Sequence, residues 1–89
     1  MPLTKKMQIR VATEVGLSVA RHYYEMFKDG DNRGPNFKWE HLPDMCRRGA
    51  AVHVGVSLPH NIKAQDEIEQ IAGDTAYNEA KRLMEDNNA

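Results

Sequence analysis

The feature that most limits how this 89-residue chain can fold is the helical spacing of apolar residues near both of its ends. In the first half, apolar or small side chains recur every three or four residues, at Ile9, Ala12, Gly16, Val19, Tyr23 and Phe27. This period predicts an amphipathic helix over 4–28, with Thr4 as its N-cap. The Asp29-Gly30 pair then supplies a stop, because glycine readily takes the left-handed conformation that ends many helices.

A second helical pattern occupies 61–86, and its inner stripe consists largely of alanine. The stripe is formed by Ala64, Ile68, Ala72, Ala76, Ala80 and Leu83. Asn61 suits the N-cap position, and Gly73 is the place where this helix is most easily kinked. Because alanine side chains are small, the stripe allows another helix to approach closely.

The segment between these helices, 37–58, contains the only tryptophan, the only cysteine and the only Arg-Arg pair. Its second half alternates between valine and other residues, which is typical of a β-strand. On a helix, however, one face would be formed by Met45, Gly49, Val52 and Val56. One strand is not a sheet, so we favour a helix over 43–56 with Pro43 at its first position. A strand would require two copies of the chain to pair.

Three helices, over about 4–28, 43–56 and 61–86, predict a single all-α domain spanning 1–89. A chain of this length buries only about 60–65% of the surface that its unfolded form exposes, so the core is thin. No apolar run approaches the roughly 18 residues of a membrane span. The single cysteine cannot form an internal disulfide, which fits a reducing compartment. We therefore expect a cytoplasmic protein, either of a bacterium or of a host cell infected by a virus.

The net charge of −1 conceals an uneven distribution. Residues 1–48 hold nine basic and six acidic side chains (+3), and residues 49–89 hold three basic and seven acidic ones (−4). This asymmetry is either ordinary surface scatter or a basic face that meets an anion or the acidic half of a second copy. We do not expect double-stranded DNA to be a partner, because the pI near 6.4 and the acidic last helix oppose a broad phosphate footprint.

The candidate ligand-binding residues are the cationic side chains gathered around the tryptophan. They are Arg33, Lys38, Trp39, Arg47 and Arg48. On the first turns of a helix, arginines join the backbone N–H groups that already favour an anion, and an indole can stack on a base. A nucleotide-like ligand is one interpretation. The other is that Trp39 anchors the core while the arginines pair with Asp44 or Glu40.

Metal sites are weakly indicated, and we expect no cofactor. Asp29, Asp31 and Glu40 have the outline of a calcium loop, but Arg33 stands where an oxygen ligand is needed. A zinc set would have to be assembled from His41, Cys46, His53 and His60, whose spacing is not that of structural zinc sites.

Nucleophilic catalysis is also weakly indicated. Cys46 lies beside two arginines, yet no glycine-rich elbow frames it. We therefore expect a protein that is not an enzyme.

The amount of apolar helix surface exceeds what one thin three-helix core can bury. Leu17 interrupts the polar face of the first helix, and Tyr24 adds a large aromatic side chain beside it. Together with the small stripe at Ala72, Ala76 and Ala80, these residues form the predicted interface of a homo-oligomer. A monomer with a few exposed apolar residues is the alternative.

One arrangement within 19–56 resembles a known group of proteins. Ala20-x-x-Tyr23-Tyr24-Glu25 is followed by a loop, then by Trp39-Glu40-x-Leu42-Pro43, with Arg47 and Arg48 after it. This is similar to small helical accessory proteins of phages, and partly resembles one half of a ryanodine-receptor-type repeat. The last helix departs from that pattern, and the second half of such a repeat is absent.

The resemblance implies a phage-type accessory protein that binds and neutralises a host target. Two mechanisms fit it: sequestering a nucleotide-like signal, or blocking a host defence protein by direct contact. No catalytic residue carries over from the resemblance. A structural or assembly protein that acts only through helix–helix contacts is the alternative function.

Overall fold

The computed structural model describes residues 4–30, 33–57 and 62–87, without the side chains of 62–65 and 87. It contains α1 (Lys5–Phe27), a short 3-10 helix η1 (Trp39–His41), α2 (Leu42–Ser57) and α3 (Ile62–Asn87). The predicted all-α fold is confirmed, and these ranges contain no strand. The ambiguous central segment is therefore helical, from Leu42 to Ser57.

The ends of α1 are formed by the residues that the sequence suggested. The Thr4 hydroxyl accepts a hydrogen bond from the Met7 N–H at 3.2 Å, which is the arrangement of an N-cap. Gly30 follows the helix with φ of +81°, a conformation that favours glycine. Arg33 then donates from Nε to the Phe27 carbonyl at 2.7 Å and from Nη2 to the Lys28 carbonyl at 3.2 Å. Its guanidinium thus caps the end of α1.

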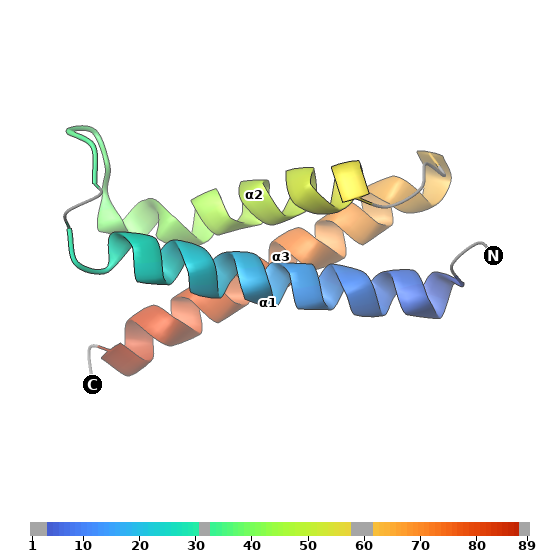
Figure 1. Ribbon diagram of the computed structural model, residues 1–89, viewed down its shortest axis with the longest axis horizontal. Coiled ribbons are helices and arrows are strands. Elements are labelled where there is room, and N and C mark those ends of the chain that lie inside the picture. The colour runs from blue at the N-terminus through green and yellow to red at the C-terminus, as the bar shows by residue number, and fades with distance from the viewer. Residues whose placement is uncertain (1–3, 31–32, 58–61, 88–89) are drawn as a thin grey trace.

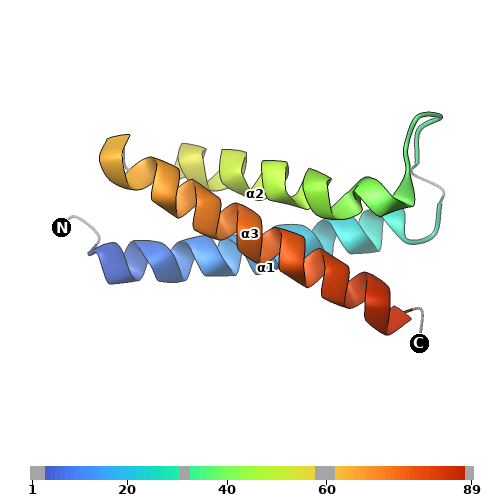
Figure 2. The same cartoon turned by 180° about the vertical axis from the view of Figure 1, so that it is seen from behind.

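The helices form a slab with two layers. Figures 1 and 2 show α1 and α2 side by side in opposite directions, with α3 crossing behind both of them in Figure 1 and in front of them in Figure 2. The slab measures 43 × 26 × 17 Å. Because α3 covers only one side of the α1–α2 layer, the other side of that layer faces outward.

The core consists of rows with four-residue spacing on each helix. Buried side chains come from Ala12, Ala20 and Tyr24 of α1, from Leu42, Cys46, Ala50 and Val54 of α2, and from Ile68, Ala72, Ala76 and Ala80 of α3. Gly16 belongs to the α1 row, and a Cβ built on it would lie 2.5 Å from the Ala72 carbonyl oxygen. The backbones of α1 and α3 therefore touch at this crossing.

The alanine stripe does allow a helix to approach closely, but that helix belongs to the same chain. Ala72, Ala76 and Ala80 are fully buried, and Tyr24 is buried beside the Trp39 ring at 5.9 Å. Leu17 is half-buried. The predicted interface is corrected accordingly, since four of its five residues are covered by the protomer itself. Gly73 does not break α3; it leaves room for Arg47, whose Cγ would lie 3.0 Å from an added Cβ.

One buried carboxylate joins α1 to α3. Glu79 is only 6% exposed, and its two oxygens accept from Arg21 Nε at 2.9 Å and from Arg82 Nε at 2.6 Å. The hydrogen bond from Arg82, with a second from Arg21, lowers the pKa of Glu79, although burial acts in the opposite direction. Because the folded-state pKa is depressed, the stabilisation is present above the unfolded pKa and is lost as pH falls through the folded pKa.

We expect Glu79→Gln to lower the free energy of unfolding by about 1.5–3 kcal/mol at pH 7, because two charge-assisted hydrogen bonds are weakened. In urea unfolding, the difference in the free energy of unfolding between the wild type and the variant should become smaller as pH falls below about 4.5. Glu85→Gln, at an exposed site on the same helix, is the control. A gap that stays constant from pH 7 to pH 3 would contradict a charged Glu79 as the link.

Candidate functional site

The predicted basic pocket around Trp39 is occupied by a side chain of the protein itself. The Arg33 guanidinium lies over the Trp39 ring, with Cζ 4.5 Å from its centroid, and 5.6 Å from the centroid of Phe37. The same guanidinium donates to two backbone carbonyls at the end of α1. Trp39 is half-buried against Tyr24. Arg33 and Trp39 therefore stabilise the connection between α1 and α2 and do not present a free stacking surface.

Arg47 and Arg48 diverge although they are adjacent. Arg47 turns toward α3, where it lies 3.5 Å from Asp74 and stacks over the Tyr77 ring at 4.2 Å. Arg48 turns the other way and shares a hollow of about 320 Å³ with Lys38 and with His41. Successive residues of a helix point about 100° apart, so this divergence follows from the helix itself.

The five predicted ligand-binding residues thus lie in three places and do not form one pocket. Lys38 and Arg48 line a common hollow, and within the described ranges neither forms an ion pair. Asn36, Phe37, Asp44 and Met45 complete its lining. The Asp44 carboxylate lies 3.8 Å from Arg47, which only partly offsets its negative charge at this hollow.

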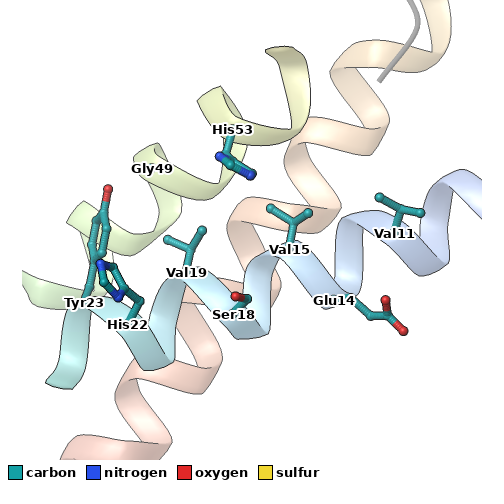
Figure 3. Close-up of a pocket in the computed structure, with 9 residues that line it drawn as sticks. All are labelled: Val11, Glu14, Val15, Ser18, Val19, His22, Tyr23, Gly49 and His53. Atoms are coloured by element: carbon teal, nitrogen blue, oxygen red, sulfur yellow. The ribbon is translucent and has the colours of Figure 1, made fainter. Parts of the chain in front are cut away.

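A second hollowed surface lies between α1 and α2, on the side away from α3. Two adjoining hollows of about 440 and 630 Å³ share Tyr23, Gly49 and His53. Figure 3 shows the first, with side chains from α1 and α2 pointing toward it. We call the combined surface the open face. It is lined by Val11, Glu14, Val15, Ser18, Val19, His22, Tyr23, Met45, Arg48, Gly49, Val52, His53 and Val56.

The open face is rich in valine. Five of the six valines of the chain line it, and only Val54 does not. Val52 is 66% exposed and Val56 is 79% exposed, whereas Val54 is 1% exposed. Solvent therefore meets large apolar side chains on one side of α2 only.

The strand-like alternation in α2 has a helical explanation. Residues 52 and 56 are about 40° apart around a helix, and residue 54 lies about 160° from 52 on the opposite side. Val54 therefore enters the core while Val52 and Val56 stay outside. The helical face noticed in the sequence, Met45 through Val56, is the open one, and the buried row is offset from it. The two valines on the exposed side of α2 were the feature of the sequence that could have predicted this surface.

The outer edge of the open face along α1 is polar. Glu14, Ser18 and His22 follow one another at four-residue intervals and line the same hollow. Glu14 lies 3.7 Å from Arg10. Tyr23 crosses to α2, where Gly49 leaves space for its ring, since a Cβ there would lie 2.5 Å from the hydroxyl oxygen.

The residues considered for metal binding and catalysis are separated or inert. In the described part of the chain, no three His, Cys, Asp or Glu side chains gather as a metal site requires. His60 and Asp31 lie outside the described residues. Cys46 is fully buried, and burial raises the pKa of its thiol to about 12, so the nucleophilic thiolate is not formed near neutral pH.

Nor does any helix of the described residues combine the length and hydropathy that crossing a membrane requires. Comparison with known proteins gives no match for this chain among family models, curated proteins or solved structures.

Proposed function

We propose that this protein acts by binding, not by catalysis, and that its open face receives an amphipathic helix of a protein partner. The observation that carries the proposal is the exposure of Val52 and Val56 beside a groove between two helices. Large apolar patches on a small protein favour association, because covering them removes apolar surface from water. The buried, protonated thiol of Cys46 supports a role without covalent chemistry.

The shape of the open face favours a helical occupant. α3 already lies across one side of the α1–α2 layer, and a further helix on the other side would cover that layer in the same way. Amphipathic helices dock into such grooves through apolar side chains at three- and four-residue spacing. Arg48, at one end of the surface, offers a charge to the polar face of the incoming helix.

The resemblance to phage accessory proteins suggests what the partner is. In that role the chain would neutralise a host protein by stoichiometric contact, with the open face covering a helix that the host protein needs. The alternative is an assembly role, in which the same face joins structural subunits. Both roles use the same surface and differ in the identity of the partner.

Val52→Arg tests the surface directly. The side chain is mostly exposed, so we expect the variant to fold normally while a charge in the apolar groove reduces capture of the partner from host lysate at least tenfold. Asn78→Arg, on the exposed side of α3, is the matched control and should capture as the wild type does. Equal capture of the same protein by wild type and Val52→Arg would contradict the proposal.

A nucleotide-like anion remains the second candidate ligand, favoured by Lys38 and Arg48, which line one hollow and form no ion pair with the described residues. A cyclic nucleotide at 100 times its Kd should add about 2.7 kcal/mol of stability in a thermal-shift measurement. Lys38→Ala with Arg48→Ala should abolish the shift, and Arg47→Ala should leave it, because Arg47 points toward α3. No shift with any nucleotide would remove this candidate.

A further inference from the structure

We propose that the open face also binds a second copy of this chain, with the two α1 helices antiparallel about a two-fold axis near Ser18. The inference rests on the proposed function, because it names a partner of the same face. It differs from the predicted interface, which used residues that the protomer buries. The argument depends on charge, on the position of the valines and on the size of the face.

The polar edge of α1 is complementary to itself. Glu14 and His22 lie four residues on either side of Ser18 and line the same hollow. At 1.5 Å per residue, each is about 6 Å from Ser18 along the helix axis. When α1 meets α1 of the second copy in the opposite direction with Ser18 at the centre, each Glu14 faces His22 of the other copy. The imidazole N–H donates and the carboxylate accepts, and the contact occurs twice.

The same axis brings exposed valines together. Tyr23 of α1 lies against Gly49 of α2, and the two helices run in opposite directions. Val52 is therefore within about one turn of Ser18 along the slab. A two-fold that sets Ser18 on Ser18 places Val52 near Val52 of the second copy. A contact of this kind is isologous, so one exposed side chain is covered on both copies at once.

The area and the charge of the face fit a dimer. The broad side of the slab, 43 × 26 Å across, is large enough to contain an interface of the roughly 800 Å² per partner that stable complexes bury. Glu14 and Arg48 are the only Asp, Glu, Lys or Arg side chains that line it among the described residues. The exposed acidic residues of α3, Asp74 among them, are not part of the lining of the open face.

Charge-swapped variants provide the test, measured by sedimentation equilibrium on the full chain. The wild type should approach twice its 10.1 kDa mass at high micromolar concentration. His22→Glu places two like charges opposite each other, and Glu14→Lys removes the acceptor, so each variant alone should dimerise about three- to thirtyfold more weakly. An equimolar mixture should recover a dimer, because Lys at 14 then meets Glu at 22. Circular dichroism should show all variants folded.

The mixing experiment separates the pairing from effects within one chain. Glu14→Lys also disturbs the contact with Arg10, but that loss would not be repaired by adding a second variant. A wild type that stays at 10.1 kDa up to several hundred micromolar overturns the inference. A mixture of the two variants that dimerises no more strongly than either variant alone overturns it as well. If capture of a host protein still depends on Val52 in those cases, the proposed function stands; if that dependence is also lost, both fall.

Discussion

Replacing Gly16 with valine is expected to lower the free energy of unfolding by about 3 kcal/mol, because the added side chain strikes the backbone of α3. A Cβ at this position would lie 2.5 Å from the Ala72 carbonyl oxygen, 2.9 Å from Thr75 Cβ and 3.1 Å from the Ala76 nitrogen. Backbone atoms cannot swing aside as the end of a flexible side chain can. The α1–α3 crossing must therefore open, and with it the contacts of the alanine stripe.

The size of this effect matters because the domain is small. At roughly 0.05–0.15 kcal/mol per residue, 89 residues give a total stability of about 4–13 kcal/mol. Urea unfolding followed at 222 nm measures the loss. Gly34→Ala is the control, since a Cβ at Gly34 meets nothing within 4 Å. Substitution of an exposed glycine within a helix would raise the free energy of unfolding, because glycine destabilises helices. A Gly16→Val variant as stable as the wild type would therefore show that α1 and α3 are not in backbone contact.

Leu42→Ala is expected to cost about 2–5 kcal/mol, since it removes most of a fully buried side chain and leaves a cavity. Leu42 is the first residue of α2 and also the C-cap of η1, because its backbone N–H donates a hydrogen bond to the Trp39 carbonyl. It therefore fixes both the start of α2 and the connection from α1. The loss should appear as a lower urea midpoint with an unchanged slope, which indicates a change in stability alone.

Val52→Ala is the matched control for Leu42→Ala, because it also truncates an aliphatic side chain on α2 but at an exposed site. We expect it to change the free energy of unfolding by less than about 0.5 kcal/mol at concentrations where the chain is monomeric. If the two variants lost similar stability, Val52 would have to be packed within the protomer, and the open face would not exist.

The sequence was sufficient to predict the long helices and the residues that cap α1, whereas Asn61, the predicted N-cap of α3, lies outside the described residues. The three- and four-residue spacing that leads from Ile9 to Phe27 has no strand interpretation, and Thr4 and Gly30 mark the two ends. The central segment was harder, because the alternation of Val52, Val54 and Val56 fits either state until tertiary contacts decide. On a helix, the alternation places two valines outward and one inward, and local propensity does not show which of the three is buried.

The candidate site was less predictable, because it depends on which partner each side chain finds. Arg33 follows Phe27 by six residues, and nothing in the sequence indicates that its guanidinium donates a hydrogen bond to the Phe27 carbonyl. The alanine stripe was correctly identified as a place of close approach, yet the sequence does not state whether the approaching helix is in the same chain. The divergence of Arg47 and Arg48, by contrast, follows from the helical repeat alone.

The claim that the open face is the binding surface is tested most directly by a valine methyl NMR spectrum. The spectrum would be recorded as the partner, a captured protein or a second copy at rising concentration, is added. Five methyl pairs, from Val11, Val15, Val19, Val52 and Val56, should shift on binding, while Val54 in the core serves as the internal reference. Saturating binding that leaves those five unchanged would contradict the account.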